Sequence, residues 1–169
     1  MQNYQRITHT FEPVFDSRSE VLILGTFPSV KSRENHFYYG NPQNRFWSVT
    51  AALTGEEVPK TVPEKRDFLL RCHIAVWDVI AECEIAGSSD SSIRNVTAND
   101  LSVVLCGAPI REIFANGAKA YELYMKYCYP TLGREITKLP STSPANAAWS
   151  LPRLVEDWGR LIDLKEQDL

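Results

Sequence analysis

Apolar runs typical of buried strands alternate along this chain with stretches of helical periodicity. This alternation limits the fold more than any other feature of the sequence. Strands that alternate with helices are typical of α/β folds, in which helices cover a mostly parallel sheet. We therefore predict an α/β fold whose strands lie in the apolar runs at residues 21–24, 74–80, 110–115 and 135–139.

Helical periodicity fills the intervals between these strands. Pro63 suits the first turn of one helix, and Gly55 ends the helix before it. The periodic segments predict helices over 46–54, 63–72, 99–105 and 118–127. A last helix carries an apolar stripe formed by Trp149 or Leu151 together with Leu154, Trp158, Leu161 and Ile162.

Length and composition are those of one folded domain. The 169 residues, 44% of them hydrophobic, suffice for one compact core and are too few for two ordinary domains. The first residues lack the apolar segment of a signal peptide, and no apolar run elsewhere could span a bilayer. We expect a single domain over residues 1–169 and a cytoplasmic monomer that does not contact a membrane.

Charge and cysteine spacing limit the ligands. The net charge of −3 and the pI near 5.6 exclude a uniformly basic nucleic-acid-binding protein, although a local cationic face is compatible with them. The four cysteines form no CxxC pair and have no histidine at metal-ligand spacing. We expect reduced, mostly buried thiols, and we expect neither a metal nor a cofactor.

Each predicted strand leads into a polar loop. In sheets of this kind, ligands bind in the crevice at the carboxyl ends of the strands. The loops that follow Gly25, Trp77, Asn116 and Pro140 should therefore face a common site. The first of these loops is longer than a simple connection, and such loops in compact domains are often functional.

A sharp turn, GTFPS, begins this first loop at Gly25. The turn could direct backbone N–H groups toward an anion, and the hydroxyl groups of Ser29 and Ser32 could add contacts to DNA phosphates. Taken alone, the pentapeptide is equally compatible with a Gly-Pro turn that only reverses the chain.

The second half of the loop, YYGNPQNRFW at residues 38–47, supplies the context. Together the two halves resemble the mug/thymine-DNA glycosylase branch of the uracil-DNA glycosylase superfamily, in which a Gly-x-Asn-Pro-Gly turn precedes an aromatic residue and then His-Pro-x-Asn-x-Phe-Trp. The sixth family, the hypoxanthine-DNA (deoxyinosine) glycosylases, is more similar still. Matching segments in the same order extend the resemblance over nearly the whole chain, at 74–80, 91–95, 114–119 and 139–144.

The resemblance implies a three-layer α/β/α sandwich with a central, mainly parallel four-stranded sheet. It also implies hydrolysis of the N-glycosidic bond of a deaminated base in DNA, preferably hypoxanthine, in base excision repair. The enzyme would bend the duplex, flip the damaged nucleotide into its pocket and leave an abasic site. No lysine stands at a family nucleophile position, so strand cleavage through a Schiff base is not expected.

Two departures from the family pattern change the predicted roles. Phe27 stands where the better-known branches have an Asn or Asp that positions the attacking water, and a phenyl ring cannot orient water. The resemblance to the hypoxanthine branch moves this catalytic role to Asn44, whose alternative role is only to cap the helix that carries Phe46. Leu139 replaces a His or Asn of several families, so a histidine that stabilises the departing base is absent.

Three further positions are candidate base-binding residues. Asp78 matches a base-reading Asn and could hydrogen-bond to a purine, with a surface aspartate or a turn cap as the alternative. Asn116 is a candidate for the same wall, unless it only tolerates a left-handed backbone beside Gly117. Tyr39 matches the stacking aromatic residue, so the base would lie between its ring and apolar neighbours such as Phe27.

The loop after the last strand is expected to contact DNA. Residues 140–146 would enter the minor groove, with the hydroxyl side chains of Ser141, Thr142 and Ser143 near the flipped nucleotide and its phosphates. We also predict a local basic rim formed by Lys31, Arg33, Arg45, Lys119 and Lys138.

Two other functions are compatible with this sequence. Phe27 and Asp78 do not determine which base the pocket accepts, so the substrate could be uracil or another deaminated base. Alternatively, the chain could be a non-catalytic module that binds lesion DNA and kept the fold after losing the Asn or Asp of the turn.

Overall fold

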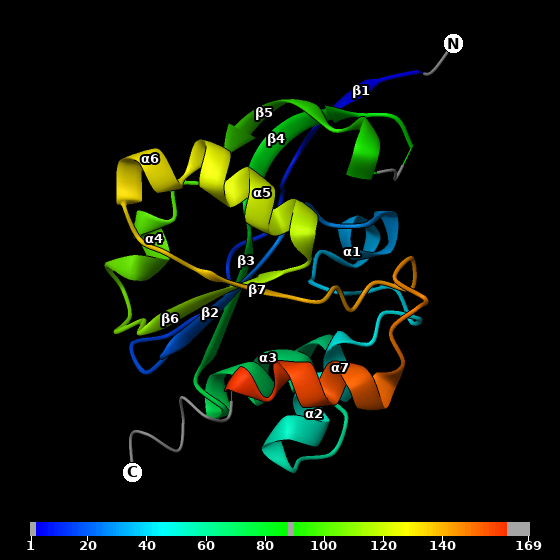
Figure 1. Cartoon of the computed structure of the whole chain (residues 1–169), viewed down its shortest axis with the longest axis vertical. Helices are drawn as coiled ribbons and strands as arrows, with labels where there is room; N and C mark the ends of the chain where they lie inside the picture. Colours follow the sequence, from blue (N-terminus) through cyan, green and yellow to red (C-terminus); the bar gives the residue numbers. More distant parts are fainter. Residues whose placement is uncertain (1–2, 88–89, 162–169) are drawn as a thin grey trace.

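A four-stranded parallel sheet forms the centre of the molecule in the computed structural model, which describes residues 3–87 and 90–161 (Figure 1). Every residue of the two strands β2 and β3 is buried. Such strands are typical of a parallel sheet covered on both faces. The predicted α/β fold and its four parallel strands are confirmed. In spatial order the strands are β3 (Ile74–Asp78), β2 (Val21–Gly25), β6 (Glu112–Asn116) and β7 (Thr137–Leu139).

Helices cover the two faces of this sheet, as expected of a three-layer sandwich (Figure 1). Local sequence signals set several of their ends. Thr61 and Glu64 form a capping box at the start of α3, and Gly55 ends α2 in the left-handed conformation. One side holds α2 (Phe46–Thr54), α3 (Val62–Arg71) and α7 (Leu151–Trp158), and the other holds α4 (Ser102–Leu105), α5 (Ala118–Tyr127) and α6 (Tyr129–Leu132).

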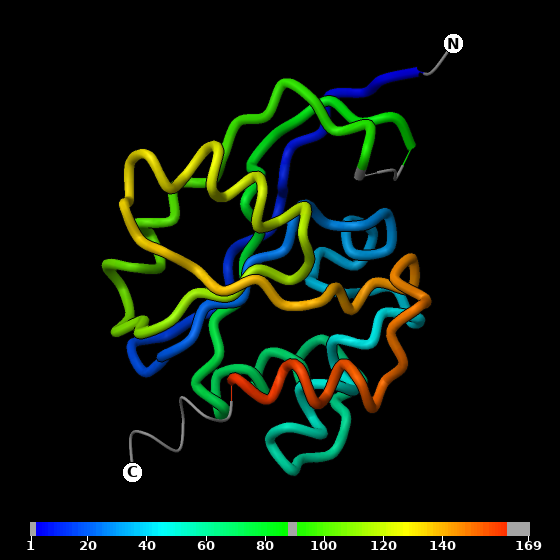
Figure 2. The backbone as a smooth tube through the Cα atoms, in the orientation of Figure 1, coloured from blue at the N-terminus to red at the C-terminus, as the bar shows by residue number. Residues whose placement is uncertain are grey.

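A second, antiparallel sheet was not predicted. Its strands, in the order β1-β4-β5, are β1 (Gln5–Thr8), β4 (Ile80–Ile85) and β5 (Arg94–Ala98). The trace in Figure 2 shows the amino-terminal segment running beside β4, and the two strands pair from Gln5 opposite Ile85 to Thr8 opposite Glu82.

The apolar run at 74–80 is two strands rather than the single predicted one. Strand β3 ends at Asp78, and the N–H group of Val79 then donates to the carbonyl of Gly25 at 2.9 Å. Ile80 begins β4 in the other sheet. Because both strands are apolar at this junction, the hydrophobic pattern does not mark the change of sheet.

Other differences from the predicted elements are short. The polar segment between β4 and the predicted helix at 99–105 contains a 3-10 turn (Asp90–Ser92) and strand β5. The long first loop contains one short helix, α1 (Val30–Asn35). In the last helical stripe, Leu154, Trp158 and Leu161 are buried and Leu151 is exposed, whereas Ile162 lies outside the described residues.

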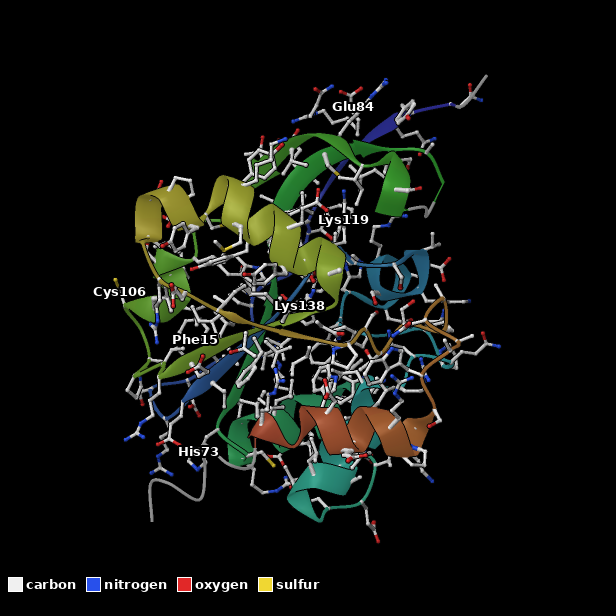
Figure 3. The ribbon with its side chains drawn as sticks, in the orientation of Figure 1. Phe15, His73, Glu84, Cys106, Lys119 and Lys138 are labelled. Carbon is white, nitrogen blue, oxygen red and sulfur yellow. The ribbon has the colours of Figure 1, made fainter. Side chains whose placement is uncertain are left out.

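Three of the four cysteines are buried, in line with the prediction of mostly buried thiols. Cys72, Cys83 and Cys128 are buried, and Cys106 lies exposed at one side of the molecule, as Figure 3 shows.

Candidate active site

The register of the parallel sheet aligns the carboxyl ends of its strands. Gly25 lies opposite Asp78, and Asn116 lies opposite Leu139. A pocket of about 450 Å³ opens at this edge, and all four predicted loops contribute to it. The structure thereby brings together all ten predicted site residues, namely Phe27, Ser29, Ser32, Tyr39, Asn44, Asp78, Asn116, Ser141, Thr142 and Ser143.

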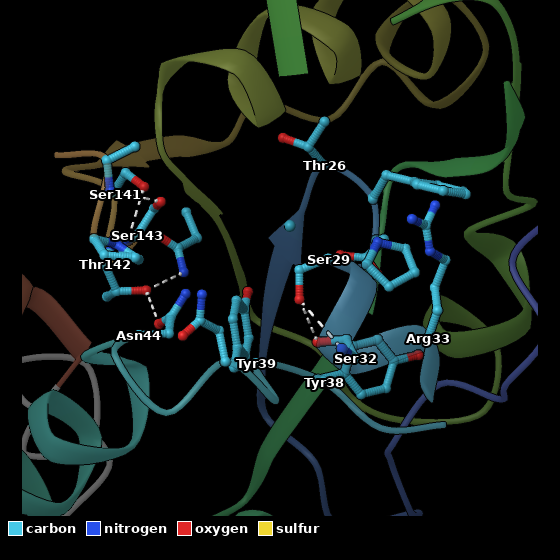
Figure 4. Close-up of a pocket in the computed structure, with 18 of the residues that line it drawn as sticks. Thr26, Ser29, Ser32, Arg33, Tyr38, Tyr39, Asn44, Ser141, Thr142 and Ser143 are labelled. Atoms are coloured by element: carbon cyan, nitrogen blue, oxygen red, sulfur yellow. Dashed lines mark hydrogen bonds between the residues drawn. The ribbon is translucent and has the colours of Figure 1, made fainter. Parts of the chain in front are cut away.

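Thr142 connects the two predicted asparagines of the site, and Figure 4 shows its hydrogen bond to Asn44. Its hydroxyl donates to Oδ1 of Asn44 at 2.8 Å and accepts from Nδ2 of Asn116 at 3.0 Å. Its backbone N–H donates to Oδ1 of Asn116, also at 3.0 Å. Thr142 is fully buried, so these bonds fix the orientation of both carboxamide groups.

Asn44 also contributes to the start of α2. Its Oδ1 accepts from the backbone N–H of Phe46 at 2.9 Å, in addition to the Thr142 hydroxyl. The N-cap of α2 is Arg45, which forms no side-chain capping bond, so Asn44 supports the helix start from one position before the cap and is not the N-cap considered as its alternative role. With both lone pairs of Oδ1 engaged, Asn44 offers the pocket its Nδ2 amino group, which forms no hydrogen bond with any residue in 3–87 or 90–161.

Arg45 holds the loop after β7 against the start of α2. Its guanidinium donates to the carbonyls of Ser143 and Asn146 at 3.0 Å each, and also to the carbonyl of Trp149. Its backbone N–H donates to the carbonyl of Thr142. These bonds make Arg45 a structural connection, and they occupy the guanidinium that we had predicted to belong to the basic rim.

Tyr39 forms one wall of the pocket in a strained backbone conformation, with φ of 49°. One face of its ring stacks on Phe46, with ring centroids 4.1 Å apart. Its hydroxyl is buried and has no partner at good hydrogen-bond geometry among the described residues. Burial, and then the charge of Asp78, raise the pKa of Tyr39, so the hydroxyl keeps its proton, although the Asn116 side chain lies near enough to lower that pKa slightly.

Asp78 is paired with a histidine that the sequence did not suggest. Nε2 of His9 lies 2.9 Å from Oδ2 of Asp78, and the two side chains are only 2% and 5% exposed. Aromatic rings surround His9, those of Phe11 and Tyr38 among them. Asp78 is therefore not a surface aspartate, and the residue directly after strand β1 supports this wall of the pocket.

Asn116 ends strand β6 without a left-handed backbone. The alternative that it serves only to permit such a turn beside Gly117 is therefore wrong.

The five hydroxyl residues of the site fall into two groups. Ser32 and Thr142 are buried, and their side chains bond within the protein, Ser32 by accepting from the N–H of Gly40 at 2.9 Å. Ser29, Ser141 and Ser143 are exposed or half-buried at the pocket. The hydroxyls of this second group also accept from backbone N–H groups of the protein, but they are the more accessible of the five.

Arg33 is the one lysine or arginine that lines the pocket in the described part of the chain. Its guanidinium lies 5.8 Å from the ring centre of Phe27, at a distance suited to a cation–π interaction. Nη1 is buried and has no hydrogen-bond partner among the residues described. A cationic donor with unused capacity therefore faces the pocket.

The other predicted rim residues lie outside the pocket lining. Lys31 pairs with Glu34 on the surface of α1, while Lys119 and Lys138 lie on α5 and β7 (Figure 3).

Residues 3–87 and 90–161 contain no group of three or more metal-ligating side chains that could hold an ion. Over the same ranges, every helix is too short or too polar to cross a membrane.

Comparison with known proteins identifies the family. The family model of the uracil DNA glycosylase superfamily matches residues 12–164, which include every residue of the pocket. The chain belongs to the uracil DNA glycosylase superfamily. Two relatives that are similar in sequence to this chain are each named hypoxanthine DNA glycosylase. The protein from Methanosarcina acetivorans is 37% identical over 151 residues, which are 87% of this chain and 93% of the relative.

The second relative, from Methanosarcina barkeri, is 34% identical over 140 residues, which are 80% of this chain and 86% of the relative. A solution NMR structure of a Methanosarcina acetivorans protein, proposed to be a uracil DNA glycosylase, superposes with a TM-score of 0.74. It is 35% identical, and the match covers 89% of this chain and 96% of the other. The uracil DNA glycosylase fold predicted from the resemblance is confirmed.

Proposed function

We propose that this chain is a monofunctional DNA glycosylase that hydrolyses the N-glycosidic bond of hypoxanthine in DNA, acting as a cytoplasmic monomer in base excision repair. Two relatives of 37% and 34% identity that carry the name hypoxanthine DNA glycosylase support this substrate. No lysine lines the pocket in the described residues, which supports hydrolysis without a Schiff base.

The observation that carries the proposal is the fixed orientation of Asn44. Thr142 and the N–H of Phe46 hold its Oδ1, and its free Nδ2 group lines the pocket. An amide held in this way can bind the oxygen of a water molecule and keep it near C1′ without reorganisation. The C1′–N9 bond breaks, its electron pair leaves with the base, the water oxygen bonds to C1′, and the released proton neutralises the base.

Arg33 is suited to assist the departure of the base. The leaving hypoxanthine carries the negative charge of the broken bond, and a guanidinium in a partly desolvated pocket stabilises such a charge. Its buried, unpaired Nη1 and its position over Phe27 support this role. In this proposal Arg33 replaces the histidine that the closing Leu139-Pro140-Ser141 segment lacks.

The remaining contacts hold the flipped nucleotide. Tyr39 and Phe27 are proposed to flank the base, with Tyr39 offering the face that Phe46 does not cover. Asn116 contributes to the polar wall through the Thr142 hydrogen bonds. The phosphates are assigned to Ser29, Ser141 and Ser143, whereas Ser32 and Thr142 are assigned internal roles because they are buried.

The decisive experiment measures release of free base from oligonucleotides that contain hypoxanthine, uracil or xanthine, each in duplex and in single-stranded DNA. We expect fastest release of hypoxanthine, with an abasic site and no strand cleavage as the product. Faster release of uracil would reassign the substrate. Binding of lesion DNA without release of any base would identify a non-catalytic module instead.

A further inference from the structure

A second cavity lies on the far side of the loop that follows β7. We call it the rear groove; it lies between Lys138, Trp149 and Arg160, and its volume is about 680 Å³. Ser141 and Ser143 line both the active-site pocket and the rear groove. The loop, which runs between α5 and α7 in Figure 1, is therefore a wall that the two spaces share.

Two cations line the rear groove. Lys138 is exposed on β7, and Arg160 is exposed just after the end of α7. The Lys138 ammonium lies 5.9 Å from the centre of the Tyr121 ring. Neither cationic side chain forms an ion pair or a hydrogen bond with residues 3–87 or 90–161. Both charges are therefore available to a ligand from outside this part of the chain.

The lining of the rear groove carries more positive than negative charge. Asp157 is its one carboxylate among the described residues, against the two cations. The whole chain has a net charge of −3, so this excess of positive charge is a local feature. A local field of this sign attracts a polyanion although the protein as a whole is acidic.

The shared wall connects these cations to the proposed path of the DNA. Ser141 and Ser143 are assigned to phosphates of the nucleotide in the pocket, and they also face the rear groove. A strand that leaves the pocket past these two hydroxyls carries its next phosphates toward Lys138 and Arg160. Arg33 is the one cation of the pocket itself in the described residues, so the groove adds the charges that a longer strand needs.

We propose that the rear groove binds the phosphate backbone of the damaged strand on one side of the flipped nucleotide, with Lys138 and Arg160 as the phosphate-binding residues. This inference rests on the proposed function. It makes the contact with the damaged strand asymmetric, because only one flank of the lesion enters the groove.

The test uses charge-changing variants of the full chain. Lys138→Gln and Arg160→Gln each remove one cation of the groove, and Asp157→Asn removes its carboxylate. Lys126→Gln is the matched control: its ammonium also lies over a tyrosine ring, 5.2 Å from the centre of Tyr127, but it lines neither the pocket nor the groove. Thermal melting first confirms that each variant is folded.

Binding is measured on three duplexes that carry an abasic-site analogue, which cannot be hydrolysed. In the first, the damaged strand extends equally on both sides of the lesion. In each of the other two, the damaged strand is shortened on one side only, while the complementary strand keeps its full length. The shortened duplexes therefore remove the phosphates of one flank of one strand.

We expect Lys138→Gln and Arg160→Gln each to weaken binding of the first duplex about fivefold to tenfold. Each should also make the slope of log affinity against log salt concentration shallower by about 0.9. Asp157→Asn should tighten binding about twofold, because it removes a charge that repels phosphate. Lys126→Gln should change neither the affinity nor the slope. With one of the two shortened duplexes, both cation variants should bind as the wild type does, and with the other they should keep their full loss.

Any other pattern overturns the inference. Equal weakening by Lys126→Gln would show a general effect of charge, and losses that persist with both shortened duplexes would show that the damaged strand does not occupy the groove. The base-release assay is independent of these measurements. A protein that releases hypoxanthine without the asymmetric losses is a glycosylase that lacks this site, whereas one that shows these losses and releases no base keeps the site and fails as a glycosylase.

Discussion

The hydroxyl of Thr142 lies 2.8 Å from Oδ1 of Asn44, although 98 positions separate the two residues in the sequence. This hydrogen bond joins the loop after β7 to the start of α2, and it continues through Thr142 to Asn116 at the end of β6. Three loops are thereby fixed relative to one another around the pocket. An amide oriented by buried partners needs no reorganisation when the reaction begins.

The first prediction concerns Asn44 itself. Asn44→Ala removes the amide that would hold the water, so we expect release of hypoxanthine to be abolished while affinity for lesion DNA is largely retained. Single-turnover release and an equilibrium binding assay measure the two effects. Asn41→Ala is the control, because Asn41 lines the same pocket from the same loop. Turnover by Asn44→Ala at the wild-type rate would refute the assignment.

The second prediction separates positioning from contact. Thr142→Val keeps the shape of the side chain but leaves Asn44 and Asn116 each without one buried partner. We expect a loss of about 1–3 kcal/mol in the free energy of unfolding. We also expect release to slow about tenfold or more in the folded protein, because Asn44 is less well oriented. Thr142→Ser retains the hydroxyl and should recover most of the free energy of unfolding and most of the rate of base release. Urea denaturation measures the first quantity, and single-turnover assays measure the second.

The third prediction concerns the charge in the pocket. Arg33→Gln removes the cation proposed to stabilise the departing base, and loss of one such group costs about 10²–10³-fold in rate in comparable sites. Lys31→Gln, on the same short helix but paired with Glu34 on the surface, should change release little. Equal slowing by the two variants would indicate a general effect of charge on DNA binding instead.

The fourth prediction uses the space beside Gly25. In Gly25→Ala the new Cβ would stand 2.4 Å from Asp78 Oδ1, which His9 prevents from moving aside. We expect this overpacking to lower the free energy of unfolding by about 1–3 kcal/mol and to abolish base release in the protein that remains folded. Gly55→Ala adds a Cβ with no atom within 4 Å, so it reports only the strain of a left-handed residue. Wild-type release by Gly25→Ala would show that the present positions of Asp78 and Tyr39 beside Gly25 are not needed for release.

The fifth prediction concerns alkaline stability. Burial raises the pKa of the Cys128 thiol from 9.0 to about 11. Because the folded pKa lies above the unfolded one, this group contributes stability that is fully present below pH 9 and is lost as the pH rises through about 11. Cys128→Ala lacks this contribution, so its free energy of unfolding should fall less steeply than that of the wild type between pH 9 and 11. Parallel curves from urea denaturation would contradict the assigned burial effect.

Much of the central fold could be predicted because its signals are local. Strands β2 and β6 are short apolar runs that end at polar loops, and α3 begins with a proline and a capping residue. The antiparallel sheet gives no such signal. Strand β5 is RNVTA, with mostly exposed or half-buried residues, and β1 has only one half-buried apolar side chain, Ile7.

The pocket residues that sequence analysis found lie directly at strand ends or in the long first loop. His9 could not be found in this way, because it is connected to the site by a hydrogen bond to a residue 69 positions away and by contacts with the rings of Phe27 and Tyr38. That bond exists because β1 pairs with β4, and the pairing leaves no pattern in the sequence of β1. The internal roles of Arg45 and Thr142 were missed for the same reason, since both depend on how the loop after β7 folds back.

The change of sheet at Val79 has a consequence for how such a protein can evolve. The groups proposed to hold the water lie just before α2 and on the loop after β7, whereas His9, directly after β1 of the antiparallel sheet, contacts Asp78 of the pocket. Substitutions in that sheet can therefore change the pocket wall at Asp78 while the proposed hydrolytic apparatus stays in place. Selection can thus broaden or narrow the range of lesions that are repaired without first passing through an inactive enzyme.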